Sequence, residues 1–105
     1  MAVTSKKLFR GAATLTTTTV LYTVPASTTT IATNIAITNT GSSAYTFTLG
    51  MGTAGANTSL HTATPIPANT TIYIDCKQAL VATETITGGA SNVAVNFHIS
   101  GVEIV

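Results

Sequence analysis

The stretch Asn92-Val-Ala-Val-Asn-Phe-His-Ile-Ser100 decides how the rest of the chain is interpreted. Its odd positions from Val93 to Ile99 are all apolar, and its even positions are polar except for Ala94. Side chains alternate between the two faces of a strand, so this pattern predicts a β-strand with one buried and one polar face. No residue in the stretch suggests catalysis, and any function of its polar face must come from surface contacts.

The composition of the whole chain also favours β-structure. Its 105 residues are enough for one domain with a modest core. Only 7% of them are charged, against about 25% in an average domain. Threonine supplies 24 residues, and its branched, half-polar side chain suits strands better than helices. We therefore expect an all-β protein.

Short alternating segments recur along the chain, separated by turn residues. Ile31, Ile35 and Ile37 share one phase, with Thr33 filling the remaining inward place, and Gly88 to Ser91 reads as a hairpin loop. About eight strands at this spacing predict an antiparallel, jelly-roll-like β-sandwich, with a closed barrel as the structural alternative. The expected strands lie in 14–24, 31–39, 44–50, 71–76, 80–82, 84–87, 92–100 and 102–105. The segment 51–67 reads as a long glycine-rich loop with at most a short strand near 60–64.

The N-terminal residues 1–12 are expected to form an arm, followed by the sandwich domain at 13–105. Three cations, Lys6, Lys7 and Arg10, flank the apolar pair Leu8 and Phe9. The arm is either a solvated tail or a segment that docks on a more acidic neighbouring subunit, with Leu8 and Phe9 as apolar anchors.

The ionisable side chains are too few to suggest an active site. Two histidines, His61 and His98, and three acids give no pattern typical of a metal site, and no nucleotide-binding or hydrolase motif is present. The single cysteine, Cys76, is in phase with Ile72 and Ile74 and is expected to be a buried thiol. We expect neither an enzyme nor a bound metal or cofactor.

Surface chemistry points instead to contacts with other proteins. A net charge of +1 argues against a nucleic-acid partner, and no apolar run is long enough to span a membrane. Strand edges usually carry charges that prevent pairing, and these strands have almost none, so we expect another subunit to cover them. Candidate contact residues are the arm residues Lys6 to Arg10, Tyr73, which is out of phase with its apolar neighbours, and Asn92, Asn96 and His98.

Several stretches taken in order carry a family resemblance. They are Leu21 to Ala26, Ile35 to Gly41, Thr46 to Leu49, Ile66 to Ile74, Leu80 to Ile86 and Val95 to Glu103. Together they make residues 8–105 resemble the small all-β virion proteins of tailed bacteriophages, which decorate or cement the capsid. One departure is Thr83-Glu84, where related sandwiches often have Gly-Asp before the strand.

The resemblance implies a role rather than a reaction. It implies a symmetric homo-oligomer, with a trimer favoured, that binds the major capsid protein or another virion protein and stabilises the shell. The protein would lie on the capsid surface and assemble in the host cytoplasm, since no secretory signal follows the N-terminal cations. Two alternatives stay open: a receptor- or glycan-binding module of a tail or fibre, and a tail or neck structural subunit.

Overall fold

Eight β-strands form the framework of the computed structural model, which describes residues 2–53 and 55–105. The strands are β1 (Val3–Ala12), β2 (Val20–Thr23), β3 (Thr29–Asn39), β4 (Tyr45–Gly52), β5 (Thr58–Ile66), β6 (Thr70–Leu80), β7 (Thr85–Ala90) and β8 (Val95–Ile104). Within these described ranges, no helix has the length and hydropathy needed to cross a membrane.

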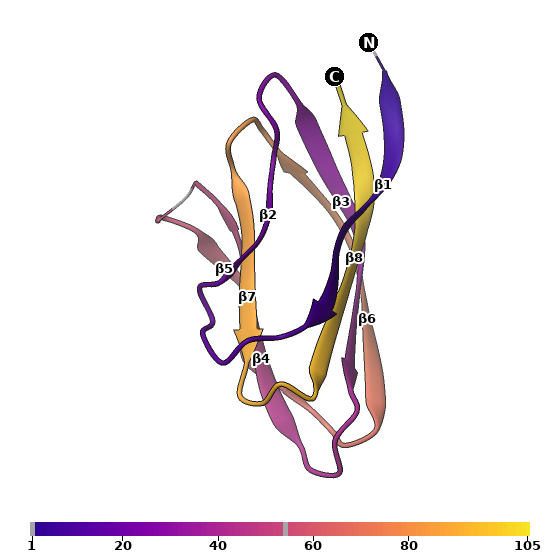
Figure 1. Cartoon of the computed structure of the whole chain (residues 1–105), viewed down its shortest axis with the longest axis vertical. Coiled ribbons are helices and arrows are strands. Elements are labelled where there is room, and N and C mark those ends of the chain that lie inside the picture. Colours follow the sequence, from indigo (N-terminus) through magenta and orange to yellow (C-terminus); the bar gives the residue numbers. More distant parts are fainter. Residues whose placement is uncertain (1, 54) are drawn as a thin grey trace.

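The strands build two antiparallel four-stranded sheets that pack face to face (Figure 1). The first sheet has the order β1-β8-β3-β6, and the second has the order β2-β7-β4-β5. Consecutive strands thus alternate between the sheets, apart from the β4–β5 hairpin, which is the connectivity of a jelly roll. The predicted antiparallel sandwich of about eight strands is confirmed, and two separate sheets replace the closed-barrel alternative.

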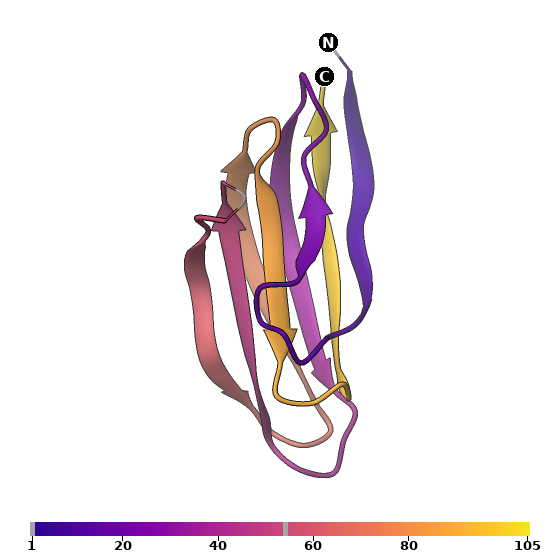
Figure 2. The ribbon, with the colours of Figure 1, turned by 60° about the vertical axis from the view of Figure 1, so that its left-hand side comes forward.

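The core lies between the sheets and is made of the inward residues that the alternation predicted. Phe47 and Phe97 pack edge to face with ring centroids 6.4 Å apart, which joins the two sheets at the centre. Ile35, Ile37 and Ile99 are fully or almost fully buried around them. The chain ends lie at one end of the sandwich (Figure 2), where Ala2 and Val105 exchange backbone hydrogen bonds.

The segment expected to be an arm forms the edge strand β1 of the first sheet. It pairs with β8 from Val3↔Ile104 to Ala12↔Asn96, with one bulge between Lys7 and Phe9. Leu8 is only 7% exposed and Phe9 packs against the core, because the bulge lets both neighbouring apolar side chains turn inward. Burial of these side chains holds the segment on its own sandwich.

A second bulge corrects the predicted phase of β3. Ile35 and Ile37 are buried as expected, but Thr33 is exposed and Ile31 is only half-buried. Relative to β8, strand β3 has one extra residue between Ala32 and Asn34, and this residue inverts the alternation toward the start of β3.

The boundaries of the opening stretch also differ from the prediction. Val93 is 59% exposed in the turn before β8, whereas Val95, Phe97 and Ile99 are buried as expected. Strand β7 runs through the glycines to Ala90, so the turn falls at 91–94 and the predicted hairpin loop at Gly88 is wrong. Position 89 of β7 requires glycine, because a side chain there would collide with the backbone of Thr14 and Thr16, which crosses directly over it.

The glycine-rich segment 51–67 is more ordered than its composition predicted. Strand β5 occupies nine of its residues and pairs with β4 at the edge of the second sheet. Ile66 is fully buried and Leu60 packs against the core, so these two side chains attach the segment to the sandwich. Conversely, most of the expected strand at 14–24 is a loop, and only β2 is regular.

Candidate partner-binding face

The outward side of the first sheet, here called the exposed face, consists of rows of side chains that cross β1, β8, β3 and β6. Residues directly opposite one another in paired strands point to the same side of a sheet. The register therefore aligns four rows. From one end of the sheet to the other, they are Ser5–Val102–Ile31–Ala79, Lys7–Ser100–Asn34–Asp75, Arg10–His98–Ala36–Tyr73 and Ala12–Asn96–Thr38–Thr71.

Five of the predicted contact residues meet on this face. Arg10, His98 and Tyr73 lie in one row, Lys7 in the row before it and Asn96 in the row after it. Tyr73 is 72% exposed, which confirms the outward orientation inferred from its phase. Residues far apart in the sequence thus form one surface, although their contact with a partner stays a prediction.

The other four predicted contact residues lie elsewhere. Leu8 and Phe9 belong to the core of this chain, so the structure does not offer them as anchors for a neighbour. Lys6 is bound to Glu103 within the chain. Asn92 lies in the turn before β8, where its Oδ1 accepts a hydrogen bond from the backbone N–H of Ala94 at 2.9 Å.

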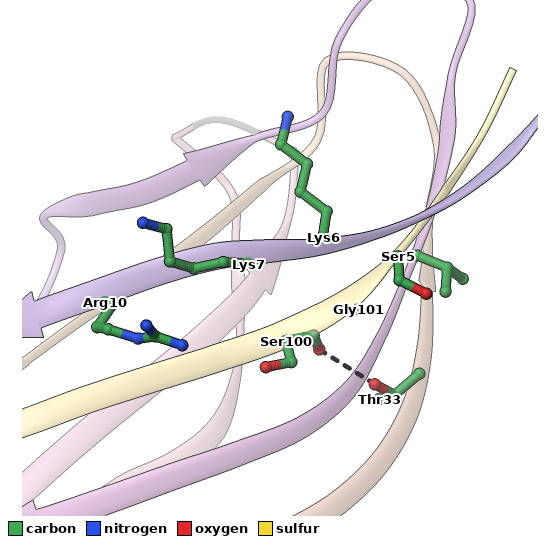
Figure 3. A pocket seen from close by; sticks show the side chains of 8 residues that line it. Ser5, Lys6, Lys7, Arg10, Thr33, Ser100 and Gly101 are labelled. Carbon is green, nitrogen blue, oxygen red and sulfur yellow. Dashed lines mark hydrogen bonds between the residues drawn. The ribbon is translucent and has the colours of Figure 1, made fainter.

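An open hollow of about 460 Å³ lies on the exposed face over β1, β8 and β3. Figure 3 shows Arg10 extending toward Ser100, whose carbonyl accepts a hydrogen bond from Thr33 Oγ1 at 3.2 Å. The two bulges, in β1 and β3, lie on either side of this hollow. Its lining is cationic and hydroxyl-rich, a combination that suits an acidic or aromatic group from outside.

One end of the exposed face is apolar, and the sequence did not reveal it. Val102, Ile31 and Ala79 share a row there, and the outward pair Val3 and Ile104 extends it toward the chain termini. Val3 is 62% exposed. The unpredicted bulge in β3 turns Ile31 outward. The outward positions of Val102 and Ile104 could have been predicted from the alternation of 102–105 if β8 had been recognised as one continuous strand.

A polar cluster inside the same end of the sandwich fixes β1 to three other strands. Glu103 accepts a hydrogen bond from the Tyr22 hydroxyl at 2.5 Å and forms a salt bridge with Lys6 at 3.2 Å. Tyr22 also shares a hydrogen bond of 2.8 Å with Thr30. Burial, together with the bond to Glu103, raises the pKa of Tyr22 to about 12. The Tyr22 and Lys6 contacts lower the pKa of Glu103.

The remaining reactive groups, Cys76 and His61, lie apart from the exposed face. Cys76 is buried, donates to the Ala32 carbonyl at 3.3 Å and has a pKa raised by burial, as expected of a structural thiol. Among the described residues, His, Cys, Asp and Glu form no group of three that could hold a metal ion. His61 packs against the Phe47 ring and bonds Thr64.

The outer side of the second sheet provides a contrast to the exposed face. A hollow of about 310 Å³ there is lined by threonines, including Thr48, Thr62 and Thr87, together with Asn57 and Ser59 and without a charged side chain. The two outward faces of the molecule therefore differ in charge, so variants on one can serve as controls for the other.

A jelly-roll sandwich with one patterned sheet face is thus the class of protein that the fold and the site define. No protein-family model matches the sequence, and no curated protein matches it. Among solved structures, the fold is similar to a chain of the IBDV viral particle, with a TM-score of 0.58 and 5% identity, and to a chain of infectious bursal disease virus strain Gx, with a TM-score of 0.52 and 11% identity.

These likenesses concern the fold alone. Each alignment covers 97% of this chain, which spans 30% and 32% of the length of the two viral chains. A pentameric capsid protein from metagenomic phage sequences also aligns, at 15% identity, but its TM-score of 0.39 carries no argument.

Proposed function

We propose that this chain is a non-enzymatic structural subunit of a virion that decorates or cements the capsid. The similarity of its jelly roll to chains of a viral particle supports a virion role. The resemblance of residues 8–105 to decoration proteins of tailed bacteriophages supports the more specific one. Stabilisation of the shell would come from contacts between subunits.

The observation that carries the proposal is the exposed face. The charges of this face, Lys7, Arg10 and Asp75, lie on the edge strands β1 and β6. A sheet face left in water usually carries charges on its central strands too, whereas β8 and β3 present Asn96, Ser100, Asn34 and Thr38 with His98 between them. Neutral hydrogen-bonding groups of this kind can be covered by a partner at lower desolvation cost than Lys or Glu. We infer that this face is buried against a neighbouring subunit in the assembled shell.

The partners in this proposal are virion proteins. The chain would form a homo-oligomer and bind the major capsid protein, or another virion protein, on the capsid surface after assembly in the host cytoplasm. A low charged fraction of 7% supports association, because few charges have to be desolvated or paired. Neither a nucleic acid nor a membrane is required as a partner.

The test is rebinding of purified protein to capsids that lack it. Replacing Asn96 with Lys places an unpaired charge on the central strand β8 within the contact and should weaken rebinding at least about tenfold. Thr62→Lys makes a matched change on the outer side of β5, where Thr62 is exposed, and should leave rebinding unchanged. Equal rebinding of both variants and the parent protein, with unchanged thermal unfolding, would refute the proposed role of this face.

A further inference from the structure

We infer that the partner on the exposed face is a second copy of this chain, packed about a two-fold axis parallel to the strands. The inference rests on the proposed function only in taking this face as a contact surface, and it names the occupant. The axis would run between the central strands β8 and β3.

The symmetry determines which residues meet. A two-fold axis along the strands, in the plane of contact, keeps each row at its own level and reverses the order of the strands. Strand β1 of one copy then lies over β6 of the other, and β8 lies over β3. Packed sheets keep their strands within about 30° of one another, so rows close to the centre stay opposite their counterparts.

The charges on the face are complementary under this axis. Lys7 and Asp75 end the same row on β1 and β6, about 14 Å apart across three strand spacings, too far to pair within the chain. The axis brings Lys7 of each copy opposite Asp75 of the other, twice per pair of copies. Lys77 follows Asp75 along β6. Under the same axis it would lie toward the row in which β1 of the other copy presents Ser5, so it would not face a cation.

The next row is complementary in shape as well as in charge. Tyr73 stands 72% exposed on β6, and the hollow lies on the β1 side of the face, where Arg10 lines it. The two-fold axis places Tyr73 of one copy over this hollow, with its ring against the Arg10 guanidinium of the other. A cation over an aromatic face is attractive, and filling the hollow would remove a void from the contact.

The apolar end of the face supplies the hydrophobic part of the contact. Val102 of each copy would meet Ile31 of the other, because the axis places β8 over β3 and keeps the level of each row. Four strands of about ten residues cover about 600 Å² per copy at ordinary strand spacing and rise. The total of about 1,200 Å² reaches the lower limit of specific, stable interfaces.

The test is the mass of the full-length chain in solution, measured by sedimentation velocity across micromolar concentrations without capsid. The parent protein should sediment as a dimer, at twice its 10.7 kDa. Lys7→Asp and Asp75→Lys should each weaken the dimer at least about tenfold, since each places like charges opposite one another. The double variant Lys7→Asp/Asp75→Lys restores both pairs and should recover the dimer.

Further variants separate this arrangement from other contacts. Val102→Lys lies on the inner strand β8, so it should abolish a face-to-face dimer while sparing any edge-to-edge pairing of β1 with β6. Thr62→Lys, on the other sheet, should leave the dimer intact, and unchanged circular dichroism would confirm that each variant folds. A monomeric parent, a trimer, or a double variant no better than the singles would overturn the inference.

The outcomes for the dimer and for the proposed function are distinguishable. A monomer that still rebinds capsids would overturn the dimer alone. A dimer that binds no capsid would overturn the virion role alone.

Discussion

At the scale of single residues, Glu103 shows how the contacts of one carboxylate connect distant parts of the chain. Its carboxylate joins Lys6 of β1, Tyr22 of β2 and, through Tyr22, Thr30 of β3. Alternation alone could not predict this cluster, because a lone acid near a chain end usually lies in water. The cluster is positioned by the register of β8, in which Glu103 pairs with Thr4 on one side and Thr30 on the other.

The pKa shifts of this cluster predict the pH range of its contribution to stability. Glu103 has a folded pKa below its ordinary value of 4.5, so its contribution is present above that value and is lost as the pH falls through the folded pKa. Tyr22 has its pKa raised to about 12, so its contribution is present below about 10 and is lost as the pH rises toward 12.

The measurement is the thermal unfolding midpoint of the parent and of Glu103→Gln as a function of pH. The parent should be the more stable at neutral pH, and the difference should shrink as the pH falls below 4.5. A constant difference at all these pH values would show that the Glu103 charge does not contribute.

Asn39 is a second residue whose role required the structure. It is fully buried, and its amide nitrogen donates to the carbonyls of Ser43, Ile66 and Pro67 at 2.8–3.2 Å. Its Oδ1 accepts from the N–H of Gly41 at 2.9 Å. Nothing in the sequence indicated this role, because the carbonyl groups that Asn39 binds lie as many as 28 residues away.

At the scale of elements, strand β1 shows why the arm was difficult to predict. Its three cations within five residues are typical of a solvated terminus, and adjacent Leu8 and Phe9 break the alternation expected of a strand. The bulge reconciles the two features by turning both apolar side chains inward. A bulge depends on the partner strand, so the sequence of β1 alone does not indicate it.

Truncating Leu8 should therefore destabilise the sandwich. Leu8→Ala removes a side chain that is 7% exposed and should lower the free energy of unfolding by about 2–4 kcal/mol, measured by urea denaturation. The matched control is Leu15→Ala, because Leu15 is 67% exposed and its truncation should cost about 0.5 kcal/mol or less. Similar losses in both variants would contradict the docking of β1 through Leu8.

At the scale of the whole molecule, the fold class could be predicted from the sequence, but the composition of the exposed face could be predicted only in part. Threonine content and alternating segments indicated the sandwich, since both report directly on strands. The phases of Tyr73, Asn96 and His98 indicated outward side chains, but the rows that they form depend on strand order and register. The apolar end was missed because a bulge inverted the phase of Ile31.

The two sides of the sandwich suggest how a subunit could serve in a shell. The exposed face carries all the ordered rows described above, while the outer side of the second sheet presents threonines without charge around its hollow. Two copies joined through their exposed faces would leave the threonine-lined sides outward.

The central claim, a structural subunit on the capsid whose exposed face is buried, is tested most directly by a cryo-EM reconstruction of the virion that contains this chain. The account predicts many copies on the shell, with Asn96, His98 and Tyr73 covered by a neighbouring subunit. A few copies at the tail, or copies on the shell whose exposed face is open to solvent, would contradict it.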